Sequence, residues 1–262
     1  MSTARNATSP IIQAAAALLE DGWRRDAFDD IAERLIDPQF PCIFSRNAFK
    51  KGLIRFLFIE TIDELCVSRL AQGLSDYVHE ARQWDGGLDT AYPLVVILGA
   101  VPAATATAVD HHHTAWSILS RLTAYDTEPW PSSLPLDPES PGWSMCFAGM
   151  PLFCNISSPA HSLRKSRNLG RYLTIVINPR ERFDQFAGDT VSGRNTRRRI
   201  RTRVASYDLL PPSPALATYG SGQLEWKQYG LHEDNLVEPD LSGCPFQFWG
   251  HATRTIDSCP AG

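Results

Sequence analysis

The chain has 262 residues, of which 43% are hydrophobic and 21% are charged, and its formal net charge is −4. A chain of this length and composition can bury a full core, so we expect one large globular domain or two small ones rather than a disordered protein. The slightly negative charge argues against a general binder of polyanions. No apolar run approaches the roughly eighteen residues that a membrane-spanning helix needs.

The N-terminal segment and the cysteines indicate a reduced, cytoplasmic protein. The apolar sequence IIQAAAALLE is preceded by a single arginine, Arg5, and is followed at once by Glu20 and Asp21. It is therefore typical of an ordinary helix rather than of an export signal. None of the six cysteines forms a C-x-x-C pair, which argues against a zinc site of the usual spacing. Without an export signal, disulfides are not expected either.

Helix and strand patterns alternate along the first half of the chain. Apolar residues recur at helical spacing over residues 9–37, and Asp37-Pro38 ends that region because the residue before a proline avoids the helical conformation. Residues 40–60 close on a strongly apolar run, IRFLFIE. The next elements are predicted as a helix over 61–83, a buried strand over 94–101 and a helix near 111–124.

The second half begins with a proline-rich connection, residues 128–143, which can be neither a helix nor a central strand. Trp130 and Trp143 bracket this connection, so we expect it to wrap over a surface or a site. The later elements are predicted as two strands over 144–157 with a turn at Ala148-Gly149, a strand over 171–179, a helix over 193–208 and weak strand character over 223–230.

These patterns favour an α+β fold with a mainly antiparallel sheet flanked by helices. No internal repeat or interior linker divides the sequence. We therefore expect a single domain over residues 1–262, with flexible ends at 1–8 and 252–262.

One basic segment, SSPAHSLRKSRNLGR at 157–171, places a histidine between two predicted strands. His161 precedes four cations, which are Arg164, Lys165, Arg167 and Arg171. A lone histidine is more often a satisfied structural group than a ligand. Arginine pairs with carboxylates or phosphates, and a heme carries two propionates and an iron that accepts imidazole. From the residues alone, a phosphate or carboxylate site is favoured over a heme site.

Three consecutive histidines at 111–113 follow Asp110. Successive residues of a helix point about 100° apart, so the three side chains cannot all ligate one metal. We interpret them as exposed imidazoles at the start of a helix that Asp110 caps. His113 is the best ligand candidate of the three.

Two further charged segments have less specific interpretations. Six arginines within residues 194–203 most often form a solvated helix face, although nucleic-acid phosphates or an acidic partner could also meet them. Without interleaved aromatic residues, nucleic acid ranks low. The acidic set Glu225, Glu233 and Asp234 is interpreted as a surface turn that could also face a cation.

Several ordered segments resemble the YqcI/YcgG family. They are FPCIFSRNAFKKG at 40–52, SMCFAGMPLFCNISSPAHSLRKSRNLG at 144–170, INPRERFDQF at 177–186, RRRIRTRVASYD at 197–208, and EWKQYGLHEDN at 225–235 with CPF at 244–246. Together they span most of the chain from residue 40 to 246. The resemblance implies a heme-dependent N-hydroxylase that converts L-arginine, or a related guanidine, to its Nω-hydroxy product in D-cycloserine-type antibiotic biosynthesis.

The resemblance also implies site residues. His161 would be the axial ligand of heme b, and the cations at 164, 165, 167 and 171 would contact the propionates. Many relatives have Leu-His where this chain has Leu122-Thr123. If that histidine is the ligand in relatives, His113 or Cys146 would be the next candidate here. A cysteine ligand would favour O–O cleavage.

Substrate and partners follow from the same resemblance. The planar guanidinium of arginine calls for a carboxylate, with Glu225 as first candidate and Asp126 as second. Arg46 or Arg201 would bind the substrate's α-carboxylate. The oxidant would be O₂, with a redox partner, or H₂O₂. The alternatives are a non-catalytic heme carrier or sensor, and a heme-free protein that binds anions or nucleic acid through the 194–203 helix.

Overall fold

A computed structural model describes residues 9–99, 106–216, 224–235 and 243–250. The ends that were predicted to be flexible, 1–8 and 252–262, lie outside the described residues. Within these ranges, no helix is long and apolar enough to cross a membrane.

The described strands form one six-stranded sheet of order β1-β2-β3-β6-β5-β4. The strands are β1 (Ile11–Ile12), β2 (Arg55–Ile59), β3 (Leu94–Leu98), β4 (Met145–Phe147), β5 (Met150–Ser157) and β6 (Leu173–Pro179). Only the described β2 and β3 pair in parallel, and the other neighbours are antiparallel. The mainly antiparallel sheet and the α+β class are confirmed.

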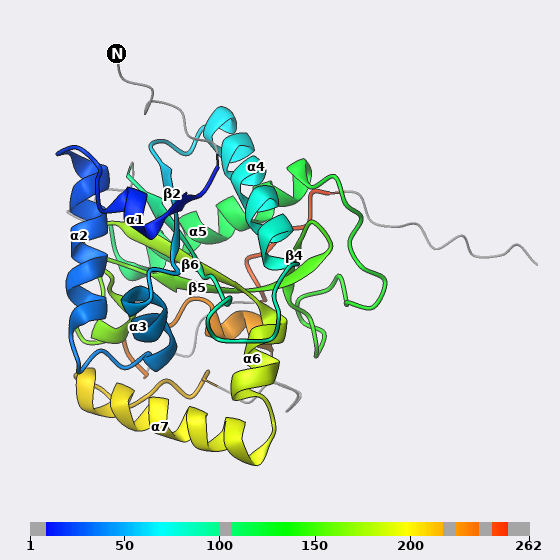
Figure 1. The fold of residues 1–262 in the computed structure, drawn as a ribbon. Coiled ribbons are helices and arrows are strands. Elements are labelled where there is room, and N and C mark those ends of the chain that lie inside the picture. Colours follow the sequence, from blue (N-terminus) through cyan, green and yellow to red (C-terminus); the bar gives the residue numbers. More distant parts are fainter. Residues whose placement is uncertain (1–8, 100–105, 217–223, 236–242, 251–262) are drawn as a thin grey trace, which may run out of the picture.

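Helices cover both faces of this sheet (Figure 1). They are α1 (Gln13–Ala16), α2 (Trp23–Ile36), α3 (Ile43–Lys50), α4 (Glu64–Ala81), α5 (Ala108–Leu122), α6 (Arg180–Ala187) and α7 (Val191–Tyr207). Three short 3₁₀ turns, η1 (Thr123–Tyr125), η2 (Lys165–Arg167) and η3 (Glu225–Gln228), complete the described elements. Helices α4 and α5 pack on one face, whereas α2 and α3 pack on the other.

The central strand β3 shows why the sheet forms. All five of its residues are buried, because side chains alternate between the two cores. Leu94, Val96 and Leu98 join the core under α4 and α5. Val95 and Ile97 join the core under α2 and α3.

The hairpin of β4 and β5 turns at the predicted dipeptide. Ala148 and Gly149 both have positive φ angles, of 48° and 66°. A two-residue hairpin turn of this kind needs left-handed backbone at both positions, which glycine adopts without strain. The two strands and the turn are therefore confirmed.

Other expectations meet a mixed outcome. The proline-rich connection contains no helix or strand, and Trp130 and Trp143 are buried in the α4–α5 core, as expected of a segment wrapped over a surface. The strand expected over 223–230 is wrong. The described part of that segment forms η3, and Trp226 and Tyr229, three residues apart, both point into the core. Leu224 and Trp226, which are separated by the single polar residue Glu225, imitate the alternation of a strand.

Candidate functional site

His161 lies in a loop that follows β5, and the loop is fixed by its own hydrogen bonds. The backbone N–H of His161 donates to the carbonyl of Ser158 at 3.2 Å. The amide Nδ2 of Asn168 donates to the carbonyl of His161 at 2.9 Å. His161 is only 2% exposed, so it is held inside the protein rather than on the surface.

The orientation of the His161 ring is set by Glu233. Nδ1 of His161 lies 2.6 Å from Oε2 of Glu233, and the other carboxylate oxygen accepts the backbone N–H groups of Ser162 and Leu163 at 2.7 and 2.6 Å. Burial lowers the pKa of His161 although Glu233 opposes this shift. The ring is therefore neutral, with Nδ1–H donating to Glu233 and a lone pair on Nε2.

That lone pair has no hydrogen-bond donor near it in the described part of the protein. Nε2 of His161 is buried without a partner, and so are Nε2 of His111 and of His112. The rings of His112 and His161 lie 5.7 Å apart, and His232 lies 6.1 Å from His112 on another side. We call these four residues the histidine cluster. Among the described residues, no three histidine, cysteine or acidic side chains lie close enough together to hold a metal ion.

The first turns of α5 supply two members of the cluster. Thr107 caps this helix and forms a capping box with Asp110, so the cap lies three residues earlier than predicted. The expectation of exposed imidazoles is wrong for His111 and His112, which are buried, but His113 is exposed. His111 shares a 2.7 Å hydrogen bond between Nδ1 and the hydroxyl of Ser158. His113 is exposed to solvent, so its side chain lies outside the cluster.

The four cations of the basic segment separate in the structure. Arg164 is buried, donating from Nε to the carbonyl of His232 at 2.6 Å and from Nη2 to Oδ1 of Asn235 at 2.8 Å. Its Nη1 is buried without a hydrogen bond. Lys165 is exposed. These two residues lie four residues or fewer from His161 in the sequence and retain N–H groups that could meet a ligand.

Arg167 and Arg171 have structural partners. Both terminal nitrogens of Arg167 donate at 2.9 Å to backbone carbonyls, those of Tyr229 and Gln228. Arg171 is exposed and pairs with Asp30 of α2, with Nε 2.9 Å from Oδ2. The basic segment thus holds the chain around residues 228–235 at one end and α2 at the other.

The two predicted carboxylate partners for a guanidinium are already hydrogen-bonded within the chain. Oε1 of Glu225 accepts the hydroxyls of Ser144 and Tyr229 at 2.7 and 2.8 Å, and Oε2 lies 2.9 Å from Nε of Arg180. Burial raises the pKa of Glu225 despite the opposing charge of Arg180. Asp126 accepts the backbone N–H of Ala148 at 2.8 Å, next to the β4–β5 turn.

The remaining predicted residues lie on other elements. Arg46 is on α3, with a buried Nε that makes no hydrogen bond to a described residue. Arg201 of α7 donates to the carbonyl of Leu216. Cys146 is buried in β4, and burial raises the pKa of its thiol to about 12, so it is a neutral thiol rather than a thiolate. Among the described hydrogen bonds, none joins Arg46, Cys146 or Arg201 to His161.

Most arginines of α7 bond to the chain itself. Arg203 donates to the carbonyls of Pro38 and Phe40 at 2.6 and 2.9 Å, which ties α7 to the connection between α2 and α3. Arg197 donates to the carbonyl of Gly188 at 2.8 Å. Arg194 pairs with Asp189 at 2.8 Å. The helix therefore uses its charge largely for internal contacts along the lower edge of the molecule (Figure 1).

The donor atoms around His161 fit a heme with one protein ligand. Nε2 of His161 offers a buried lone pair without a competing partner, and a carboxylate on the opposite ring nitrogen commonly fixes metal-bound imidazoles. Nη1 of Arg164 leaves one buried N–H for a propionate. Because Nε2 is fully enclosed, a macrocycle at this position requires the surrounding chain to move apart.

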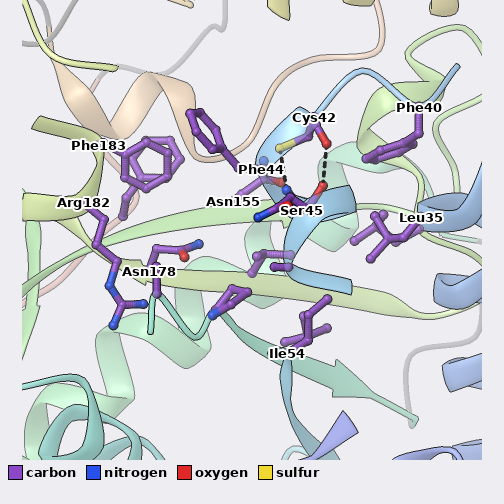
Figure 2. Close-up of a pocket in the computed structure, with 18 of the residues that line it drawn as sticks. Leu35, Phe40, Cys42, Phe44, Ser45, Ile54, Asn155, Asn178, Arg182 and Phe183 are labelled. Carbon is purple, nitrogen blue, oxygen red and sulfur yellow. Dashed lines mark hydrogen bonds between the residues drawn. The ribbon is translucent and has the colours of Figure 1, made fainter. Parts of the chain in front are cut away.

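A cavity of about 210 Å³ lies on the other face of the sheet, under α2 and α3, and His161 does not line it. Its walls are mostly apolar and include five phenylalanines, which are Phe40, Phe44, Phe153, Phe183 and Phe186. Asn155, Asn178 and Arg182 add polar groups. Figure 2 shows Arg182 beside Asn178, across the cavity from Leu35 and Phe40. Sequence reasoning missed this site, although segments 40–52, 144–170 and 177–186 all contribute to its walls.

The chain belongs to the YqcI/YcgG family, whose model matches residues 31–247. A Streptomyces lavendulae protein, provisionally named N(omega)-hydroxy-L-arginine synthase DcsA, is 56% identical over 231 residues, which cover 88% of this chain and 86% of that protein. The uncharacterized proteins YcgG and YqcI of Bacillus subtilis are 36% and 33% identical, each over 86% of this chain and 88% of the relative. No solved structure shows significant similarity.

Proposed function

We propose that this protein is a heme-dependent N-hydroxylase that converts L-arginine to Nω-hydroxy-L-arginine. The name of the 56% identical Streptomyces relative supports the reaction. The observation that supports heme as the cofactor is the buried Nε2 of His161, which has no hydrogen-bond partner and belongs to a ring that Glu233 orients. A place in D-cycloserine-type antibiotic biosynthesis, which the family resemblance implies, belongs to the same proposal.

In this proposal His161 would hold the iron of heme b, and Arg164 and Lys165 would meet the propionates. When bound, the heme supplies the iron that activates O₂ or H₂O₂ for insertion of one oxygen atom into an N–H bond of the guanidine. With O₂, the reaction would need two electrons from a redox partner and two protons, and the second oxygen atom would leave as water. With H₂O₂, no electron donor is needed.

The protein's own groups prepare the ligand atom. Glu233 accepts the Nδ1 proton, which keeps the lone pair on Nε2, and its charge makes the imidazole a better donor. Three hydrogen bonds from Ser162 and Leu163 hold Glu233 in turn. Burial excludes water from Nε2 and keeps the ring neutral, so no proton competes for the lone pair at pH 7.

The test is a product assay with the heme-reconstituted protein. L-Arginine is incubated with the protein and either H₂O₂ or O₂ plus a reducing system, and products are separated by liquid chromatography and identified by mass spectrometry. We expect a product one oxygen atom heavier than arginine that co-elutes with Nω-hydroxy-L-arginine.

Two variants make the assay specific. His161→Ala should reduce product to the level seen without heme, whereas His113→Ala, which changes an exposed histidine of α5, should leave it unchanged. Heme binding without product would identify a non-catalytic heme carrier. Equal product from the His161→Ala variant would remove His161 from the reaction.

A further inference from the structure

The cavity under α2 and α3 has walls that suit an apolar ligand. Phe44 and Phe186 pack with ring centroids 6.1 Å apart, and Phe153 and Phe183 pack at 4.8 Å. Its volume of about 210 Å³ is below the roughly 300–1,000 Å³ of sites that hold drug-sized molecules. The ligand that fits is therefore small.

The charge of the cavity comes from one residue. Arg182 is the only charged side chain among the described residues that line it, and no aspartate or glutamate lines it. Arg182 is 4% exposed and lies at the N-terminal part of α6, next to Phe183. A guanidinium or amine would meet this cation without any acid to offset it, so the cavity excludes positively charged ligands.

Arg182 is a buried cation without a carboxylate partner in the described part of the chain. Nη1 donates to the carbonyl of Tyr92 at 2.7 Å, whereas Nε and Nη2 are buried without a hydrogen bond. The other neighbours are the ring of Trp84, 5.5 Å away, and the hydroxyl of Tyr77. Burial raises the pKa of Tyr77 to about 12, so this phenol is neutral and does not balance the charge.

A buried charge is normally paired, because removal from water costs several kcal/mol unless a counter-charge compensates it. Nε and Nη2 form the side of a guanidinium that binds a carboxylate through two parallel hydrogen bonds. We infer that the cavity binds a small carboxylic acid with an apolar body, whose carboxylate pairs with Arg182 and whose body lies among the phenylalanines. Asn155 and Asn178 supply further hydrogen bonds.

The inference is independent of the hydroxylation proposal. The strand β5 separates the two regions, since Ser157 lines the cavity while the next residue, Ser158, bonds His111 of the histidine cluster. The carboxylate could belong to a free acid, or to a propionate of a heme bound at this cavity rather than at His161. Both share the chemistry that Arg182 recognises, and the experiment separates them.

The experiment is isothermal titration of the full-length, heme-free protein with octanoate, octan-1-ol and octylammonium. These probes share one apolar body and differ in charge. We expect octanoate to bind and octylammonium not to bind. Arg182→Met should weaken octanoate roughly 10- to 100-fold, the loss typical of charge-assisted hydrogen bonds, and leave octan-1-ol unchanged.

A hemin titration in the presence of octanoate identifies the source. If hemin displaces octanoate and binds more weakly to the Arg182→Met variant, the carboxylate is a heme propionate. If hemin and octanoate bind together, it is a free acid. Equal binding of octanoate to the wild type and to a folded Arg182→Met variant, or no binding to the wild type, would overturn the inference.

A second variant keeps the test valid if Arg182→Met does not fold. Ala91 lines the cavity from the loop before β3, and Ala91→Phe fills space in the cavity while leaving Arg182 itself unchanged. This variant should lose octanoate binding. Retained binding would also overturn the inference.

Discussion

The histidine cluster and the Arg182 cavity use buried polar groups in opposite ways. In the histidine cluster, Arg167 donates to backbone carbonyls, and the group left at His161 is a lone pair on Nε2, with one unbonded N–H of Arg164 close to it in the sequence. In the cavity, a cation retains N–H groups without acceptors. Lone pairs call for a metal or a proton, whereas N–H groups call for an anion. Ser157 lines the cavity and the next residue, Ser158, bonds the histidine cluster, so two sites with different ligand chemistry meet at the end of β5.

The same substitution in both regions should give the largest contrast in stability. Arg167→Met removes two charge-assisted hydrogen bonds, so the carbonyl of Gln228 loses its arginine donor and that of Tyr229 keeps only the backbone N–H of Ile156. We expect the free energy of unfolding to fall by about 3 kcal/mol. Arg182→Met removes a buried cation without a carboxylate and should change it by less than about 1 kcal/mol, or raise it. Urea denaturation of both variants measures the difference. An equal fall in the free energy of unfolding of both variants would contradict the difference between a cation with hydrogen-bond acceptors and one without them.

A smaller effect is expected at Glu225, where an acid and a cation balance each other. Burial raises the pKa of Glu225 above its ordinary value of 4.5, so the folded state binds a proton that the unfolded state has lost. The associated stability is complete below about pH 4.5 and is lost as pH rises through the folded-state pKa. Glu225→Gln cannot titrate and lacks this dependence.

Urea denaturation of the wild type and of Glu225→Gln at several pH values tests this sign. The wild type should lose stability relative to the variant between pH 4.5 and pH 7, because only the wild type carries the titrating carboxyl. The KM for L-arginine of the reconstituted enzyme should stay unchanged, because Arg180 already occupies the carboxylate. A raised KM with no difference in pH dependence would instead assign Glu225 to the substrate.

The smallest effect should come from the solvent side of α7. Arg198 is exposed, and the described bond of its side chain is to Oδ1 of Asn195 in the same helix. Arg198→Ala should therefore change the free energy of unfolding by less than about 0.5 kcal/mol. Arg203→Ala, in the same helix but bonded to the α2–α3 connection, provides the comparison and should cost more. Equal values would contradict the internal role of these arginines.

Local patterns in the sequence predicted strands β3 to β6 and the long helices, but the helical pattern expected over residues 9–37 was wrong at Ile11–Ile12, which form strand β1. The five consecutive buried residues of β3 and the Ala148-Gly149 turn are properties of short segments, and both appear as expected. The parallel pairing of β2 with β3 depends on how distant segments meet, so no local pattern could predict it. The capping box of Thr107 and Asp110 is a local signal that could have located the start of α5 and the inward turn of two histidines.

The candidate site was harder to predict because its chemistry depends on tertiary neighbours. His161 and Glu233 are far apart in the sequence, and only the fold brings them to 2.6 Å. In the sequence RERF at 180–183, nothing distinguishes Arg182 from a surface arginine. Its burial follows from packing of α6 against the sheet. The cations at 167 and 171 looked like ligand contacts in the sequence, but the folded chain supplies their partners.

Titration with hemin, followed by absorption spectroscopy, tests the central role of His161 most directly. Wild-type protein and the His113→Ala variant should develop the same Soret band at one equivalent of hemin, because His113 is exposed and lies outside the cluster. His161→Ala should shift or lose that band, and added imidazole should restore it by replacing the missing ligand. An identical Soret band in the wild type and in the His161→Ala variant would contradict the assignment of His161 as the heme ligand.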